Sequence, residues 1–242
     1  DGRMQTYDLF TVLDATWPAA EHVEVPGWHL RRGAGGGKRV SAATQTVPNS
    51  GVELAEAEMR GMDQVPLFML RPGEEALDLE LDSRGYELID PVTLYAASVQ
   101  TILDAAKPTA PVMEGSFPLA IMKDLWSENH IGAARLAVMA RTQGPHVYLL
   151  ARKNDLPGGV AFVAAHGSTA MIHAAAVSPD LRRKNLGTAL TSAAARWAQS
   201  IGADTLALAT THDNSAANQL YQRMGMLPVG TYHYRVMPDP AE

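Results

Sequence analysis

The spacing of apolar residues along this chain changes between a strand pattern and a helix pattern several times. The clearest change follows an apolar run at residues 169–177, which ends at Ser178-Pro179-Asp180. From Leu186 onward, apolar residues recur at helical spacing, at Leu190, Ala193, Trp197 and Ile201. The pattern therefore predicts a strand, a turn and a long central helix over residues 187–200.

The rest of the second half follows the same two spacings. Two helices come first, and three strands joined by short polar or glycine-containing turns precede the central helix. The other elements predicted there are helices at 119–128, 131–140 and 215–224 and strands at 146–152, 159–165, 205–209 and 231–236. This mixture of strands and helices predicts the α+β class.

The first half has weaker patterns, which predict a smaller α+β domain. A short helix is predicted within residues 7–20, ending near Trp17-Pro18, and further helices at 52–62 and 74–84. The predicted strands span 28–32, 39–43, 66–70 and 86–97. The segment Gly33–Lys38 is expected to connect two strands as a hairpin. It is not a phosphate loop, because the spacing differs and Arg39 stands where Ser or Thr should bind magnesium. Gly85 is expected to end a helix.

A joint between two domains is predicted at residues 105–111, where two prolines and several small residues interrupt both spacings. We therefore expect an accessory domain at 1–110 and a second domain at 111–242.

Composition restricts the classes of partner. The chain has 242 residues with 46% hydrophobic content, enough for a substantial core, and its formal net charge is -6. An acidic chain is not expected to bind nucleic acid or an anionic membrane surface. It contains no cysteine, which excludes disulfides and an acyl-cysteine intermediate. No apolar run reaches a membrane span and no signal segment is evident, so we expect a cytoplasmic protein. A homodimer is compatible with the sequence.

Three cations gather before the central helix, at Arg182, Arg183 and Lys184. A helix N-terminus offers unpaired N–H groups and a partial positive charge, so this turn suits an anion such as phosphate. Asn185 tolerates a left-handed conformation, and Gly187 allows a ligand to approach the backbone closely. The alternative is an ordinary connection between a strand and a helix, with a solvated basic turn.

Two motifs carry a resemblance to a known family. Arg182-x-x-Asn185-x-Gly187, after Val177-x-Pro179, is similar to the acetyl-CoA-binding motif of the GNAT N-acetyltransferase superfamily, with Asn185 in place of the first glycine. Residues 214–226 resemble the family's Asn-x-x-Ala-x-x-Leu-Tyr-x-x-x-Gly-Phe, which is found downstream at this distance. The order of predicted elements is similar to that of the family from about residue 111 to residue 236.

The resemblance implies a mostly antiparallel mixed sheet flanked by helices, with acetyl-CoA as the cofactor. It implies that the pantetheine arm lies between two strands that splay apart and bonds the backbone of the strand at 169–177. The cofactor-binding residues expected on this basis are Ala175, Ala176, Val177, Arg182, Arg183, Lys184, Asn185, Leu186, Gly187, Thr188, Ala189, Asn214, Ala217 and Tyr221. Asn214 can alternatively cap the helix that follows it.

The resemblance also implies catalytic roles. Tyr221 occupies the position from which many members of the family protonate the departing sulfur, and a phenol stays protonated near neutral pH. His173 lies where many members carry a glutamate base, and imidazole can accept a proton near neutral pH. Core packing is the alternative for both residues. Glu128 and His130 are substitute bases.

The activity implied is direct transfer of acetyl to the primary amine of a small molecule, by the domain at 111–242. The substrate is expected near Trp126, Glu128 and His130, and no metal site is indicated. The alternatives are acetylation of protein or peptide amines and a sensor that binds acyl-CoA without turnover. The first half is either a degenerate GNAT-like domain or an unrelated accessory layer.

Overall fold

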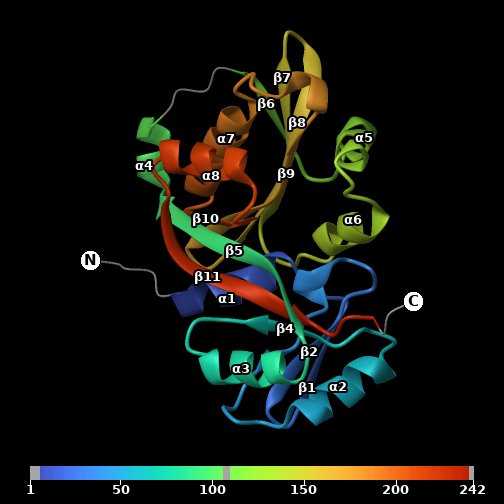
Figure 1. Ribbon diagram of the computed structural model, residues 1–242. Coiled ribbons are helices and arrows are strands. Elements are labelled where there is room, and N and C mark those ends of the chain that lie inside the picture. Colours follow the sequence, from blue (N-terminus) through green and yellow to red (C-terminus); the bar gives the residue numbers. More distant parts are fainter. Residues whose placement is uncertain (1–5, 106–109, 240–242) are drawn as a thin grey trace. The chain divides into compact units, whose positions relative to one another are not determined.

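The computed structural model describes residues 6–105 and 110–239, which form two compact units. The large unit holds residues 6–18, 94–105 and 110–229, and the small unit holds residues 19–93 and 230–239. Figure 1 follows the chain by colour. Each unit is therefore assembled from segments that lie far apart in the sequence.

The sheet of the large unit carries the candidate site. Its strands are β6 (Val112–Gly115), β7 (His146–Lys153), β8 (Leu156–His166), β9 (Thr169–Val177) and β10 (Thr205–Thr211), with the end of β5 (Glu87–Ser98) beside β10. Strands β6 to β9 pair with their neighbours in antiparallel fashion, whereas β10 runs parallel to β9. The sheet is mixed and mostly antiparallel, as predicted.

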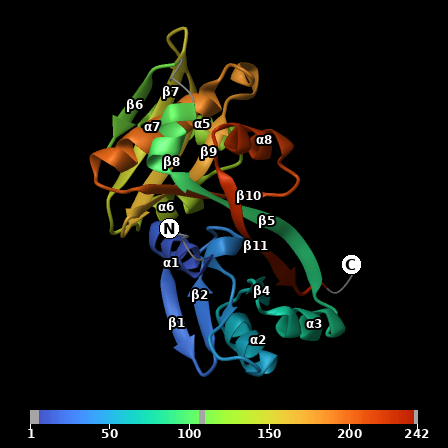
Figure 2. The ribbon, with the colours of Figure 1, turned by 90° about the vertical axis from the view of Figure 1, so that its left-hand side faces the viewer.

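Helices cover both faces of this sheet (Figures 1 and 2). Helices α7 (Leu186–Ser200) and α4 (Val99–Ala105) pack together, and α7 lies on β7, β8 and β9. Apolar side chains such as Ala161 and Val163 face α7, so their neighbour Phe162 faces the opposite side. That side is covered by α1 (Thr6–Thr16) and α5 (Ala120–Glu128), while α6 (Ala133–Ala140) and α8 (Ser215–Arg223) complete the unit.

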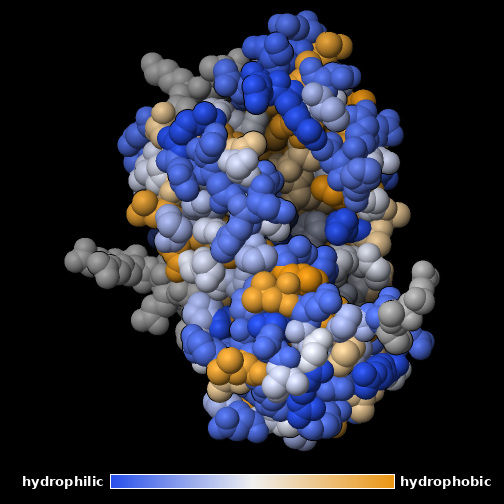
Figure 3. Space-filling model, in the orientation of Figure 1, coloured by the Kyte–Doolittle hydropathy of each residue, from blue (hydrophilic) through white to orange (hydrophobic). Residues whose placement is uncertain are grey.

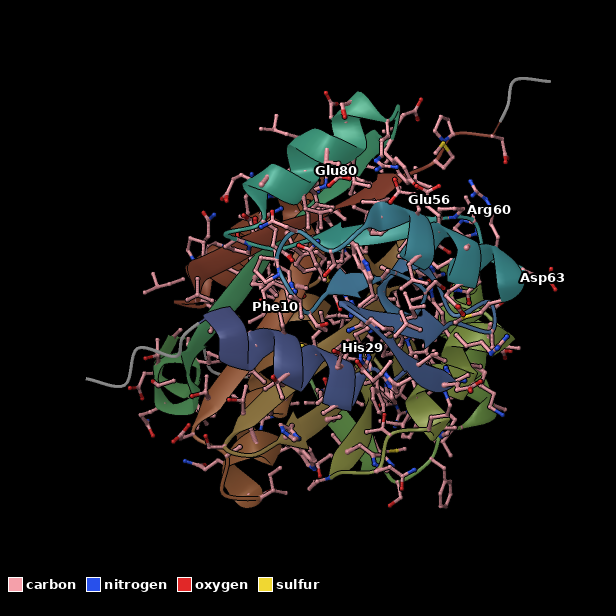
Figure 4. All side chains as sticks on the ribbon, turned by 90° about the horizontal axis from the view of Figure 1, so that it is seen from below. Phe10, His29, Glu56, Arg60, Asp63 and Glu80 are labelled. Atoms are coloured by element: carbon pink, nitrogen blue, oxygen red, sulfur yellow. The ribbon has the colours of Figure 1, made fainter. Side chains whose placement is uncertain are left out.

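The small unit has its own sheets and core. Strands β1 (Glu21–Val25), β2 (Trp28–Arg32) and β3 (Thr44–Gln45) form one sheet, and β4 (Leu67–Leu70) pairs with the later part of β11 (Leu227–Val236). Helices α2 (Val52–Gly61) and α3 (Glu75–Ser83) complete it. Trp28, Phe68 and Tyr86 meet edge to face in the core. Figure 4 shows Glu56 and Arg60, which form an ion pair one turn apart on α2, with the arginine exposed and the carboxylate partly buried.

The same order of elements occurs twice in the chain. The order is three strands, a helix, a strand, a helix and a strand. It runs from β1 to β5 in the first half, with α2 and α3, and from β7 to β11 in the second half, with α7 and α8. The parallel bridge between Ala43 and Phe68 corresponds to the parallel pairing of β9 with β10. The final strands are exchanged, because the end of β5 joins the large unit and most of β11 joins the small unit.

Most predicted elements are confirmed within one to four residues of their predicted ends. Strands 28–32 and 169–177 match without adjustment, and α7 begins one residue earlier than predicted. Gly85 ends α3 in a left-handed conformation, with φ of 90°. The sequence patterns did not reveal β1, β3, α4 and β6, because these elements are short and carry mixed polar and apolar residues.

The predicted strand at 39–43 is wrong. Lys38–Val40 forms a single 3-10 turn, and β2 forms its tight hairpin with β1 through Pro26-Gly27. Gly27 there has a φ of 84°, which favours glycine. The segment 33–38 is therefore a connection between β2 and this 3-10 turn. It leads on to the short strand β3.

The two units do not follow the predicted domains at 1–110 and 111–242, because each unit contains residues from both of them. Helix α1 belongs to the large unit because it packs on β8 and β9, and α4 belongs there because it packs on α7. Residues 106–109 of the predicted joint lie outside the described residues. Among those that are described, no helix is both long enough and apolar enough to cross a membrane.

A charged network fixes β11 within the small unit. Arg235 is buried, and its guanidinium donates hydrogen bonds to Asp78 at 2.8 Å and to Asp82 at 2.9 Å. His233 contacts the same Asp78 oxygen at 2.7 Å. Burial alone would raise the pKa of Asp78, but the hydrogen bonds from Arg235 and His233 prevail and lower that pKa. The exchanged strand is thus held in the small unit by its charged contacts to α3 as well as by its pairing with β4.

We predict that Asp78→Asn destabilises the protein at neutral pH by about 2 kcal/mol, because Arg235 then lacks its main partner. Because the pKa of Asp78 is lowered in the folded state, its carboxylate stabilises the fold fully at pH values above the unfolded-state pKa, about 3.9 for Asp. This contribution is lost as the pH falls through the folded-state pKa. Urea unfolding should therefore show that the free energy of unfolding of the wild type exceeds that of Asp78→Asn at neutral pH, and that this difference is smaller at about pH 3.

The exposed Asp63 at the end of α2 provides the control, since Asp63→Asn should leave stability nearly unchanged at both pH values. A difference of equal size at both pH values would contradict the role given to the Asp78 carboxylate.

Candidate active site

Strands β9 and β10 part at the centre of the large unit. Their parallel register runs from the pair Thr169 and Thr205 to the pair Ile172 and Leu208, although both strands continue beyond it. The backbone of Ala175 to Val177 therefore borders a cavity on the side where β10 was paired. Such an edge can accept another extended chain. The resemblance implied two strands that splay apart, and β9 and β10 part in this way.

A bulge in β9 lies directly beyond the last of these pairs. Phe162 pairs with His173 and Val160 pairs with Ala176, so three residue steps of β9 oppose two of β8. Ala174, inside the bulge, has a φ of 52°, a left-handed conformation that costs a non-glycine residue about 1 kcal/mol. The surrounding structure must hold it there.

Trp126 supplies one such restraint. Its indole Nε1–H donates to the carbonyl oxygen of Ala174 at 2.8 Å, and the side chain is fully buried. The ring packs edge to face on Tyr148, with centroids 6.2 Å apart. The structure thus gives Trp126 a role in shaping β9. The substrate was expected near Trp126, but this side chain does not line the cavity.

The basic turn before α7 has the backbone form of an anion site. Arg183 and Asn185 both have a φ of 62°, as expected for Asn185 from the sequence. Asn185 is the N-cap, but its side chain makes no capping hydrogen bond. Helix geometry leaves the first N–H groups of α7 without intrahelical acceptors, and this first turn contains no acidic residue. An anion would satisfy these donors.

A cavity of about 630 Å³ connects this turn with the splayed strands and with α8. The surface between α8 and α5 is hollowed, and its floor is apolar (Figure 3). Most of the predicted cofactor residues line the cavity, namely Ala175, Ala176, Val177, Arg182, Arg183, Asn185, Leu186, Gly187, Thr188, Asn214, Ala217 and Tyr221. Lys184 is exposed and Ala189 is buried in the core, and neither of them lines it.

The cavity lining includes residues that sequence reasoning missed, namely Asn129, Ile172, Leu181, Leu190, Thr191, Ala216, Leu220 and Arg223. Arg223 is exposed at the end of α8 and adds a further cation to this wall. Its place within the second motif could have indicated it, because Tyr221 two residues earlier was identified. Asn129 carries no such signal, since it follows α5 in a connection that belongs to neither motif.

Tyr221 is the buried side chain of α8 and reaches the cavity from that helix. Its hydroxyl makes no hydrogen bond to any residue that the structure describes. Burial raises the pKa of Tyr221 to about 12. The phenol therefore stays protonated at neutral pH and can donate a proton to a group in the cavity.

Asn214 combines the two roles considered from the sequence. Its Oδ1 accepts a hydrogen bond from the backbone N–H of Ala217 at 3.2 Å, so it caps α8. It also lines the cavity. Because capping uses only the oxygen, the amide Nδ2–H groups can face a ligand.

His173 lies apart from this lining. It is buried on the face of the sheet opposite α7, stacked on Trp17 with ring centroids 5.1 Å apart. Thr16 donates its hydroxyl proton to the carbonyl of Val12 at 2.7 Å, so its oxygen accepts from His173 Nε2–H, also at 2.7 Å. Helix α1, from the start of the chain, thus covers the histidine that the sequence favoured as the base.

The two substitute bases are exposed. Glu128 ends α5, and His130 follows Asn129 in a left-handed conformation with a φ of 62°. Neither lines the cavity, although Asn129 between them does. Within the described ranges, no group of three or more His, Asp or Glu side chains could hold a metal ion. The chemistry available here is anion binding and proton transfer.

Comparisons with known proteins agree with this geometry. Residues 106–226 match the model of the Acetyltransferase (GNAT) family. No curated protein sequence matches the chain. Among solved structures, a GCN5-related N-acetyltransferase from Kribbella flavida is similar at a TM-score of 0.71 with 18% identity, over 99% of this chain and 97% of that one.

Two further structures share the fold over most of this chain. A tandem GNAT protein from the clavulanic acid biosynthesis pathway has a TM-score of 0.63 and 15% identity, covering 89% of this chain and 79% of its own. A conserved protein of unknown function from Staphylococcus epidermidis has a TM-score of 0.69 and 11% identity, covering 92% and 95%. With the family model matching half of the sequence, the chain belongs to the GNAT family of acetyltransferases.

Proposed function

We propose that this protein is an acetyl-CoA-dependent N-acetyltransferase that moves acetyl directly to the primary amine of a small molecule. The observation that carries the proposal is one continuous cavity. It joins a left-handed basic turn at a helix N-terminus, the free edge of β9 and the protonated phenol of Tyr221. An anion site, an extended slot and a proton donor are what a thioester of coenzyme A requires.

The residues present fit this group. The first-turn N–H groups of α7 and the cations Arg182, Arg183 and Arg223 would hold its phosphates. The backbone of β9 at Ala175 to Val177 and the free amide of Asn214 would hold the amides of the pantetheine arm. The bound group supplies an acetyl thioester, whose C–S bond breaks as the amine nitrogen forms the new C–N bond.

Tyr221 gives its proton to the departing sulfur, so coenzyme A leaves as the thiol and no charge accumulates on it. The phenol recovers a proton from solvent. The attacking amine must lose one proton to a base, and the net change is amine plus acetyl thioester to amide plus thiol. We assign the base to the exposed pair Glu128 and His130 beside Asn129, because His173 is buried and its Nε2 is hydrogen-bonded.

We infer that the first half of the chain is a GNAT-like repeat that does not bind the cofactor. It has the same order of elements, but the connection between β3 and α2, residues 46–51, contains no cation. Glu53 stands in the first turn of α2, where hydrogen bonding from Arg84 lowers the pKa of its carboxyl. A fixed negative charge at a helix N-terminus opposes phosphate binding. The second half therefore carries the activity.

The experiment that tests the proposal is a calorimetric titration with acetyl-CoA, followed by a screen of amines. Saturable binding at one site per chain, with thiol release on addition of a small primary amine, is the expected result. Free polyamines, amino acids and aminoglycosides should be compared with a peptide array. Turnover only on peptides would overturn the small-molecule assignment, and binding without turnover on any amine would indicate a sensor.

Replacement of Tyr221 by Phe should lower kcat by about 100-fold, because the leaving sulfur loses its proton donor, while the Kd for acetyl-CoA rises by no more than about fivefold, the effect of one hydrogen bond. Steady-state kinetics and calorimetry measure the two quantities. The pKa of Tyr221 lies at about 12, so the phenol stays protonated below about pH 10. The wild-type kcat should therefore not fall through deprotonation of Tyr221 in that pH range. Unchanged kcat in the variant would reject the assignment.

Gly187→Ala should weaken acetyl-CoA binding by about tenfold. A Cβ at Gly187 would lie 2.7 Å from Cδ2 of Leu220, which must then move within the cavity wall. Gly61→Ala at the end of α2 is the matched control, because a Cβ there has no atom within 4 Å. Calorimetry should find equal affinity for the control and the wild type, and equal affinity for Gly187→Ala would mean that the ligand does not occupy this cavity.

Trp126→Phe keeps a ring in the core but removes the hydrogen bond to the carbonyl of Ala174, so the bulge of β9 should relax. We expect the Kd for acetyl-CoA to rise about fivefold, since the edge of β9 is displaced. Trp197→Phe, on α7, is the control for loss of an indole. If both variants bind acetyl-CoA as the wild type does, the bulge does not contribute to the cofactor site.

A further inference from the structure

Tyr95 lies outside the segment that matches the GNAT family, yet it contacts the helix that carries Tyr221. It belongs to β5, the final strand of the first half, and its own part of that strand is in the large unit. Its hydroxyl donates to Asn218 Oδ1 at 2.7 Å and accepts from Gln222 Nε2 at 3.3 Å. One buried hydroxyl therefore binds two successive turns of α8.

Helix α8 depends on such bonds because it buries little apolar surface. Tyr221 is its one buried side chain, and Leu220 and Ala217 are only partly buried. Asn218 extends the network from Tyr95, since its Nδ2 donates to the carbonyl of Thr211 at 3.0 Å and to that of Asn214 at 2.7 Å. The hydroxyl of Tyr95 is thus connected to the end of β10 and to the start of α8.

The ring of Tyr95 also packs directly on Tyr221. The two ring centroids are 6.1 Å apart, with an angle of 47° between the ring planes. Tyr95 is 2% exposed, so its ring is fixed by the core of the large unit. Contacts to the ring of Tyr221 and hydrogen bonds to the helix on either side of it restrict both the position of α8 and the direction of the phenol.

We propose that Tyr95 is a positioning residue for Tyr221, so that the exchanged strand of the first half aligns the proton donor of the second. The inference rests on the proposed function, because it assumes that the hydroxyl of Tyr221 meets the sulfur of coenzyme A. It gives the first half a direct part in the reaction without a ligand of its own. Loss of the Tyr95 hydroxyl would leave Asn218 Oδ1 without its donor and release α8 from β5.

The test compares the binding of coenzyme A with that of desulfo-coenzyme A, which lacks the sulfur, and needs no amine substrate. We expect the wild type to bind coenzyme A about fivefold more tightly, which corresponds to about 1 kcal/mol for one hydrogen bond. Tyr221→Phe should remove this preference. Tyr95→Phe should remove it as well, while the affinity for desulfo-coenzyme A stays within about twofold of that of the wild type.

The double variant separates positioning from general destabilisation. Because Tyr95 acts through Tyr221, Tyr95→Phe should change nothing further in a Tyr221→Phe background. Tyr148→Phe is the control, since it removes the hydroxyl of another buried tyrosine of the large unit, and it should retain the full preference. Asn218→Ala, which removes the partner of the Tyr95 hydroxyl, should lose the preference as Tyr95→Phe does.

Three results would overturn the role of Tyr95. These are a full preference for coenzyme A in both Tyr95→Phe and Asn218→Ala, an equal loss of affinity for both ligands, and a preference that survives in Tyr221→Phe. Failure of the proposed function looks different, because the wild type would then show no saturable binding of acetyl-CoA.

Discussion

The parting of β9 from β10 is the constraint on which the site depends. Parallel pairing ends at Ile172 and Leu208, and the bulge at Ala174 follows directly. A strand that loses its neighbour exposes backbone groups that require partners, and these groups border the cavity. The indole of Trp126 holds the bulge from the opposite face. The cavity beside β9 is therefore produced by an interruption of the sheet that the core maintains.

The two faces of β9 have different tasks because side chains alternate along a strand. Ile172 faces α7 and lines the cavity, whereas His173 faces α1 and is enclosed by Trp17 and Thr16. Two neighbouring residues of β9 therefore lie on opposite faces of the sheet, Ile172 in the cavity wall and His173 in the core beneath α1. Tyr221 reaches the cavity from α8, and its burial keeps the phenol protonated. The phenol side chain that lines the cavity beside β9 therefore comes from a helix and not from the sheet.

The exchange of final strands joins the two halves of the sequence. The end of β5 lies beside β10 in the large unit, and most of β11 pairs with β4 in the small unit, where Arg235 binds Asp78. The exchange brings Tyr95 of the first half into the unit that holds the cavity, and α1 with Thr16 belongs to the same unit because it packs on β8 and β9. A chain limited to residues 106–226 would lack these contacts. The accessory half contributes structure to the site even though Glu53 makes its own helix N-terminus unsuited to phosphate.

Local features could be predicted from the amino-acid sequence alone, because they depend on neighbouring residues. Apolar spacing predicted α7 and β9, and the chemistry of Asn185 predicted its left-handed turn. The two motifs also gave the candidate cofactor residues, and most of these, Tyr221 among them, line the cavity. Which distant segments meet became evident only from the folded structure. No local pattern shows that α1 covers His173 or that Trp126 bonds Ala174. The same holds for the approach of Tyr95 to α8, because that contact depends on an exchange of strands separated by more than a hundred residues in the chain.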